Sequence, residues 1–180
     1  MKKFLAVLFV VFLVAGFANA QGKIALGVNA GIALPMGDFG DGYDMGFGGN
    51  GLFVYHASPN VDVTGSVGYL TWSGKDALDG ATFSSIPVLV GARYLFGQGK
   101  FNPYIGAELG MHFSSSDYEI MGVSYSASDS FFGWGAGAGF LYQIGNNMDL
   151  DVAAKYNSIS SEGSASDYVS VFVGLLFGLN

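Results

Sequence analysis

The sequence predicts an all-β protein: an eight-stranded antiparallel up-and-down transmembrane β-barrel. Three observations support this fold class. After residue 20 the chain alternates apolar with small or polar residues in eight segments; short and long connections also alternate; and 51% of the 180 residues are hydrophobic while 12% are charged. A period of two places successive side chains on opposite faces of a strand. The only long apolar run lies at the N-terminus, so strands rather than helices are expected to cross the membrane.

The first twenty residues have the features of an export signal. Lys2 and Lys3 give a positive start, residues 4–14 form an apolar core, and residues 18–20 (Ala-Asn-Ala) supply a small-x-small cleavage site. We expect cleavage after Ala20, leaving one barrel domain over residues 21–180. An uncleaved anchor helix is the alternative, disfavoured because the run is short for a span of ~20 residues.

Composition excludes several classes of protein. The chain has no cysteine, which excludes disulfide scaffolds, thiol enzymes and cysteine-ligated metal centres. We expect no cofactor and no metal site. Five basic residues follow residue 20 against 14 acidic ones, giving a net charge of −9, and these bases are scattered. Nucleic acid is therefore not an expected partner.

The first four strands follow from their alternation. Residues 23–34 are the clearest case, with an apolar face formed by Ile24, Leu26, Val28, Ala30, Ile32 and Leu34. Residues 45–56 are ambiguous, because aromatic residues compete with Leu52 and Val54 for the outer face, and we favour the aromatic ones, Phe47, Phe53 and Tyr55, outside. Residues 61–69 and 86–96 continue the pattern, with odd-numbered outer residues on the third strand and even-numbered ones on the fourth.

The last four strands repeat this contrast. They cover residues 104–113, 132–143, 149–157 and 169–179, and the sixth places glycine at four inner positions, Gly133, Gly135, Gly137 and Gly139. Small inner residues suit an eight-stranded barrel, whose interior has room only for packed side chains. Closure also removes the unpaired strand edges that hydrocarbon does not tolerate. A soluble lipocalin-like barrel is the alternative fold.

The connections alternate in length as they do in transmembrane barrels. Short turns are expected at 57–60, 97–100 and 145–147, and long polar loops at 35–44, 73–83, 114–130 and 158–167. Aromatic residues gather near both strand ends, as two membrane interfaces require. On the loop side the girdle comprises Tyr69, Trp72, Trp134 and Tyr156, and on the turn side Tyr94, Phe96 and Tyr142.

Three runs resemble a known family, the small eight-stranded outer-membrane β-barrels of the OmpA and OmpX type. They are residues 86–96 (IPVLVGARYLF), 102–110 (NPYIGAELG) and 133–140 (GWGAGAGF). The resemblance implies a structural or surface-interaction protein of a Gram-negative-type outer membrane, without catalysis. It also implies contact with outer-membrane lipid and lipopolysaccharide, and insertion by the barrel-assembly machinery. Family members commonly end in an aromatic residue, whereas this chain ends in Asn180, and Phe177 is the candidate substitute.

Four charged residues fall on inner faces in the half of the barrel nearer the short turns: Arg93, Glu108, Asp151 and Lys155. Buried charges must be paired to offset their desolvation. We therefore expect a network in the lumen, with Asp62 and Asp149 at its lower edge. This network either plugs the barrel or, if its pairs can exchange, gates a narrow pore for ions or small solutes.

Two further hypotheses concern chemistry and binding. His112 and Ser114 lie on the same face as Glu108. Together they supply the residue types of a Ser-His-acid hydrolase. Lipid A deacylases are barrels that use these residue types, so a lipid-modifying enzyme is the third hypothesis. However, neighbours at i and i+2 on one strand point in parallel rather than towards each other. The long loops carry ten acidic residues and are candidate sites for an extracellular ligand or for cations that bridge to lipopolysaccharide.

Overall fold

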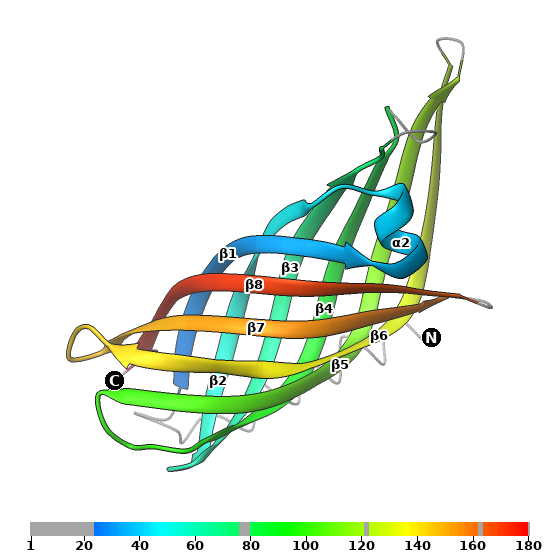
Figure 1. The fold of residues 1–180 in the computed structure, drawn as a ribbon. Coiled ribbons are helices and arrows are strands. Elements are labelled where there is room, and N and C mark those ends of the chain that lie inside the picture. Colours follow the sequence, from blue (N-terminus) through cyan, green and yellow to red (C-terminus); the bar gives the residue numbers. More distant parts are fainter. Residues whose placement is uncertain (1–23, 76–79, 121–122, 162–163, 180) are drawn as a thin grey trace, which may run out of the picture.

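The computed structural model describes residues 24–75, 80–120, 123–161 and 164–179; the side chains of residues 117–125 are not described. The predicted export signal lies outside the described residues. Figure 1 shows the barrel with strands β1 to β8 in chain order around its wall. The elements are β1 (Ile24–Met36), α2 (Gly37–Gly42), β2 (Gly46–Ser58), β3 (Val61–Ser73), β4 (Thr82–Leu95), β5 (Phe101–Ile120), β6 (Val123–Gln143), β7 (Met148–Ser161) and β8 (Ser164–Leu179).

The eight strands form a closed antiparallel barrel, which confirms the predicted fold class. Each strand pairs with the next, and β8 returns to pair with β1 from Ile24↔Leu179 to Met36↔Asp167. Closure satisfies the backbone groups that an open edge would expose. We call the end with the β2–β3, β4–β5 and β6–β7 connections the turn end, and the opposite end the loop end. No helix in the described part of the chain is long and apolar enough to span a membrane.

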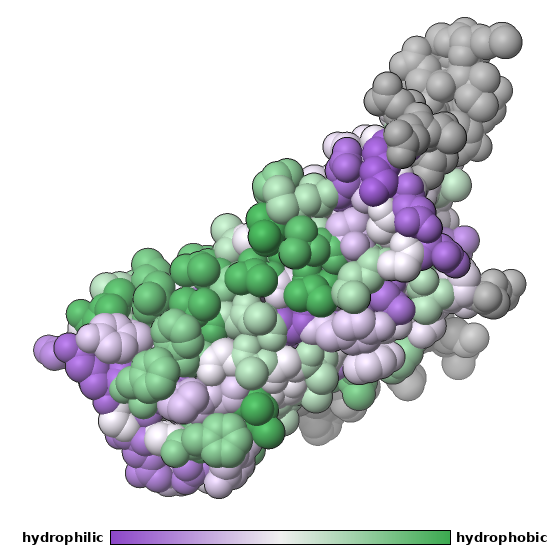
Figure 2. All heavy atoms as spheres, viewed as in Figure 1, coloured by the Kyte–Doolittle hydropathy of each residue, from purple (hydrophilic) through white to green (hydrophobic). Residues whose placement is uncertain are grey.

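The outer surface is apolar because one face of every strand points away from the lumen. Val28, Val67 and Ile105 are each more than half exposed. Figure 2 shows hydrophobic residues over the middle of the visible face and hydrophilic residues towards both ends. On β2, Phe47 is 55% exposed and Val54 is fully buried, so the aromatic face lies outside, as the sequence favoured. An apolar band between two polar ends is the pattern of a barrel in a bilayer.

The predicted long loops are for the most part not loops, and this prediction was wrong. The segment 114–130 continues β5 and β6 as a paired hairpin, from Ser114↔Asp129 to Ile120↔Val123. Residues 158–167 likewise continue β7 and β8, and β1 runs to Met36. Figure 1 shows the β5–β6 hairpin projecting furthest beyond the barrel. On the β6 arm of this hairpin, residues 126–130 are exposed on both faces, so the apolar contrast that reveals a strand within the membrane is lost there.

A short helix occupies part of the segment 35–44, where the sequence predicted only a loop. Gly37 begins α2 with a positive φ of 57°, a conformation that glycine adopts without strain. The helix turns Phe39 inward, and this side chain is buried. The loop after β1 therefore folds back over the loop end of the barrel.

Glycines inside the barrel make room for large side chains on neighbouring strands. A Cβ at Gly139 would lie 2.6 Å from the Tyr104 ring, and one at Gly46 would lie 2.5 Å from the Trp72 indole. Such distances are shorter than any ordinary contact, so a larger residue at either position would force the neighbouring ring to shift. The repeated glycines of β6 thus leave space in which side chains of β5 and β7 pack against the β6 backbone.

Candidate functional site: the charged lumen

Arg93 is the centre of a buried ion cluster on the turn side of the lumen. Its Nε donates to Asp62 Oδ2 at 2.7 Å, and its Nη1 lies 3.5 Å from Asp151 Oδ2. All three side chains are at most 5% exposed. The Tyr104 hydroxyl donates to Asp151 Oδ1 at 2.7 Å, and the Arg93 guanidinium lies 5.0 Å from the centre of the Tyr104 ring. One cation thus holds two carboxylates, and a ring stacks beside it.

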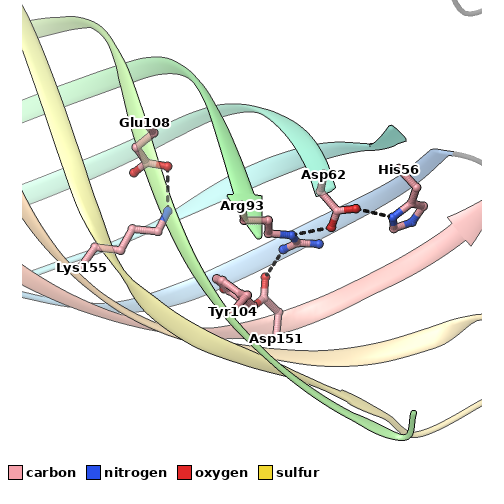
Figure 3. Close-up of polar contacts among 7 residues, drawn as sticks. All are labelled: His56, Asp62, Arg93, Tyr104, Glu108, Asp151 and Lys155. Atoms are coloured by element: carbon pink, nitrogen blue, oxygen red, sulfur yellow. Dashed lines mark hydrogen bonds and ion pairs between the residues drawn. The ribbon is translucent and has the colours of Figure 1, made fainter. Parts of the chain in front are cut away.

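His56 extends this cluster towards the turn end. Its Nδ1 lies 2.7 Å from Asp62 Oδ1, and its side chain is 37% exposed. Asp62 therefore receives contacts on both oxygens, from Arg93 and from His56. Figure 3 shows these side chains converging from β2, β3, β4, β5 and β7.

A second ion pair lies apart from the first cluster. Lys155 Nζ donates to Glu108 Oε2 at 2.7 Å, with side chains 29% and 12% exposed. Figure 3 shows this pair on one side and the Arg93 cluster on the other. The four predicted residues therefore do point into the lumen, but they form two groups rather than one network. Asp62, expected at the lower edge, is a direct partner of Arg93 instead.

A cavity of about 40 Å³ lies between the two groups. It is lined by Arg93 and Asp151 from one group, Glu108 and Lys155 from the other, and Asn29, Asn50, Thr64 and Ser66 among its polar neighbours. Packed apolar side chains lie beyond it towards the turn end, namely Ala25, Val54, Leu95, Leu141, Ala153 and Leu176. The charges thus run from the middle of the barrel to His56 near the turn end, beside these apolar side chains.

The loop end of the lumen is filled by an aromatic cap around Trp72. Phe39 of α2 stacks edge-on against Trp72 at 5.4 Å between centroids, and Tyr168 does so at 5.3 Å. Trp72 Nε1 donates to the carbonyl of Ala33 at 3.1 Å, and the side chain is 1% exposed. Ile159 joins the same buried cluster.

Trp72 is therefore not part of an outer aromatic girdle, and its predicted position was wrong. The outer residues of β3 are odd-numbered, such as Tyr69, and Trp72 belongs to the even, inner set with Asp62 and Leu70. Its position near a strand end suggested an interface role, but the alternation rule already placed it inside. A tryptophan fits there because its N–H finds a backbone acceptor.

The remaining girdle residues lie on the outer surface. Their exposed fractions range from 38% to 58%, for Tyr69, Tyr94, Phe96, Trp134, Tyr142 and Tyr156. The rings pair along the wall: Tyr94 with Phe96 at 5.3 Å and Trp134 with Tyr156 at 5.8 Å. Lys100 Nζ lies 5.3 Å from the centre of the Tyr142 ring at the turn end. That these rings mark the two membrane interfaces stays a prediction.

His112 and Ser114 meet through a third residue that sequence reasoning did not include. His112 Nδ1 lies 3.3 Å from Ser85 Oγ, and Ser114 Oγ donates to Ser85 Oγ at 3.3 Å. All three side chains are at most 4% exposed. The fourth strand predicted from the sequence starts at Ile86 and so leaves out Ser85, which the structure includes in β4. Continuing the alternation would have placed Ser85 on the inner face.

Two other functional candidates were also missed. Tyr104 falls on the inner face by alternation, but a tyrosine carries no formal charge, so pairing opposite charges in the sequence does not select it as a partner for Asp151. His56 lies beside a turn, and its contact with Asp62 spans the β2–β3 connection. No group of three or more metal-ligating side chains occurs among the described residues.

Comparison with solved structures finds the same fold in small bacterial barrels. Neisserial surface protein A is 20% identical, with a TM-score of 0.66 over 87% of this chain and 97% of its own. The attachment invasion locus protein Ail of Yersinia pestis is 17% identical, with a TM-score of 0.62 over 87% and 99%. A major outer membrane protein of Thermus thermophilus is 15% identical, with a TM-score of 0.62 over 86% and 98%. At these identities the likeness concerns the fold.

Sequence comparison identifies the family. A search of curated proteins found no match. The family model described as "Outer membrane protein beta-barrel domain" matches residues 4–177, which is most of the chain and spans all eight strands. The closed barrel, its apolar outer band and this match agree, and the chain belongs to the outer membrane protein β-barrel family.

Proposed function

We propose that this protein is an integral outer-membrane barrel with a structural or surface-interaction role, and that its lumen does not transport solutes. The observation that carries this proposal is the filling of the lumen. The aromatic cap fills the loop end, the two ion-pair groups and the turn-end apolar cluster fill the rest of the lumen, and the cavity between the two groups is about 40 Å³. A filled interior leaves the loop end as the surface through which the protein can act.

The chemistry of the loop end favours a cationic partner. Asp38, Asp41 and Asp44 lie around α2, and Asp129 is exposed on the β5–β6 hairpin. Divalent cations that bridge to lipopolysaccharide phosphates, or a basic extracellular ligand, would complement this charge. The four segments 35–44, 73–83, 114–130 and 158–167 remain the proposed contact region. Two relatives by fold are named as a surface protein and an attachment protein, which is consistent with this role.

Export and assembly complete this proposal. Cleavage after Ala20 would release the barrel domain into the periplasm, and the barrel-assembly machinery would insert it with both termini on the periplasmic side. The turn end then faces the periplasm and the longer loop end faces outward. Phe177, which pairs with Leu26 and Met148 and lies on the outer face at 42% exposed, is the proposed substitute for a terminal aromatic residue.

The geometry of His112 supports the absence of catalysis. A hydrolase needs its nucleophile open to substrate, with the base in hydrogen-bond reach. Ser85, Ser114 and His112 are instead buried on the inner side of the barrel. These residues fit a hydrogen-bonded layer that spaces the ion pairs from the aromatic cap.

A narrow pore is the second candidate function, and the two separate ion pairs are the observation that favours it. Glu108 and Asp151 both line the cavity beside Arg93 and Lys155, so a cation could exchange one carboxylate for another. Such an exchange would open a path only if the packed layers at both ends also moved.

Conductance separates these two functions. The mature chain would be refolded, shown to be inserted by heat-modifiable gel mobility, and recorded in a planar bilayer as wild type, as Arg93→Ala, and as Val90→Ala, a substitution on the outer face of the same strand. We expect no steady current from wild type. Steady channels that Arg93→Ala alters and Val90→Ala does not would establish the pore instead.

A binding assay tests the surface role. Bacteria expressing wild type would be compared with a variant in which Asn-Gly replaces residues 116–127, keeping Ser115 and Ser128 as the last paired residues of a two-residue hairpin. We expect weaker attachment of the variant to polylysine-coated surfaces at equal surface expression. Unchanged attachment of this variant and of the triple variant Asp38→Asn, Asp41→Asn, Asp44→Asn would argue against the acidic loop end as the contact region.

A further inference from the structure

Three buried polar atoms around the lumen cavity have no hydrogen-bond partner among the described residues. They are Arg93 Nη2, Asn29 Oδ1 and Asn50 Oδ1. Asn29 and Asn50 face each other across β1 and β2, and all three residues line the same cavity of about 40 Å³. A buried polar group without a partner costs roughly 1–3 kcal/mol, so three in one place require an explanation.

The chemistry of these atoms selects the occupant. Arg93 Nη2 can only donate, whereas the two amide oxygens can only accept. A free cation would be repelled by Arg93 and Lys155 and would leave Nη2 unpaired. An anion would be repelled by Asp151 and Glu108 and would leave the amide oxygens unpaired. Water both donates and accepts, so it satisfies all three atoms, and it does so whichever way the asparagine amides are turned.

The size of the cavity agrees with this occupant. One buried water needs about 10–15 Å³ of such volume, so 40 Å³ holds roughly three waters. The lining also offers the Thr64 and Ser66 hydroxyls and the carboxylates of Glu108 and Asp151. Each water therefore has the two to four polar partners that buried waters require.

We propose that the cavity is a water-binding site, in which about three ordered waters bridge Arg93, Asn29 and Asn50. Through these waters the Arg93–Asp62–Asp151 cluster and the Glu108–Lys155 pair become one hydrogen-bonded network. The lumen is then a hydrated chamber with packed layers on either side, rather than a dry plug. This inference holds whether or not the loop end binds a partner.

Nuclear magnetic resonance of the refolded wild-type barrel in lipid nanodiscs tests the site directly. We expect dipolar cross peaks between water and the side-chain amide protons of Asn29 and Asn50. Asn157 is the internal control, because it is 4% exposed and its amide donates to Lys155 O at 3.1 Å and Ser170 Oγ at 3.0 Å. We expect no such peak there. Absence of peaks at both Asn29 and Asn50 in the folded barrel would overturn the proposal.

A cavity-filling substitution gives a second, independent readout. Ser66→Leu adds apolar volume to the cavity, while Gly65→Leu adds the same side chain at the preceding position, where a Cβ meets no atom within 4 Å. If water is expelled, Ser66→Leu removes the cross peaks and lowers the folding equilibrium constant about fivefold or more, because polar groups lose their partners. A rise in that constant for Ser66→Leu would mean that the cavity is dry. If this variant does not fold, the cross peaks of the wild-type barrel still show whether water occupies the cavity.

Discussion

Removing the Arg93 side-chain charge is the sharpest test of how the lumen is held together. Arg93→Met keeps most of the side-chain volume but leaves Asp62 and Asp151 in the barrel interior without their cation. Both carboxylates are at most 3% exposed. Breaking a buried pair by removing one partner typically costs about 3–5 kcal/mol, because a buried charge is left uncompensated.

The structure places the expected cost near the lower end of that range. Asp62 keeps its contact with His56, and Asp151 keeps the hydrogen bond from Tyr104. We therefore expect Arg93→Met to lower the free energy of unfolding by about 3 kcal/mol. Lys155→Met is the matched comparison. Lys155 is 29% exposed and Glu108 is 12% exposed, so solvent screens this pair more and its loss should cost about 1 kcal/mol.

The assay is reversible urea unfolding of the refolded barrel in lipid vesicles, followed by tryptophan fluorescence. Adding Asp62→Asn and Asp151→Asn to Arg93→Met should recover part of the loss, since the uncompensated charges are removed with their partner. Equal losses for Arg93→Met and Lys155→Met, or no recovery in the triple variant, would refute the view that Arg93 neutralises two buried carboxylates.

Three further predictions concern packing. Brominated lipid should quench the fluorescence of the two tryptophans differently. In Trp134→Phe the remaining Trp72 should be barely quenched, and in Trp72→Phe the remaining Trp134 should be strongly quenched. Similar quenching of both would contradict the inward position of Trp72. Trp72→Ala should lower the urea-unfolding free energy by about 3–5 kcal/mol, clearly more than Trp134→Ala. Gly139→Ala should cost about 1–3 kcal/mol in the same assay because its Cβ meets the Tyr104 ring, whereas Gly65→Ala, in open space, should be nearly neutral.

Alternation along the chain was enough to predict the barrel and most of its inner and outer faces. Alternation alone predicts the inner positions of four residues, because successive side chains on a strand point to opposite faces. They are Arg93, Glu108, Asp151 and Lys155. The same rule places Trp72 on the inner face, where the structure has it. Its position near a strand end is what wrongly suggests the outer girdle. Where both strand faces are exposed, as at residues 126–130 of the β5–β6 hairpin, alternation loses its contrast, and the sequence therefore predicts a loop over residues 114–130.

Local patterning was thus sufficient to predict the closed barrel, its eight strands and the apolar band, since these depend on a period of two and on composition. Which charges meet depends instead on the folded barrel. Arg93 reaches Asp62 on the adjacent β3 and Asp151 on β7, while Lys155 takes Glu108, because strand register and the curvature of the closed wall set those distances. The aromatic cap, the Ser85 link to His112 and the cavity between the ion pairs likewise arise from residues far apart in the chain, and no local pattern encodes that convergence.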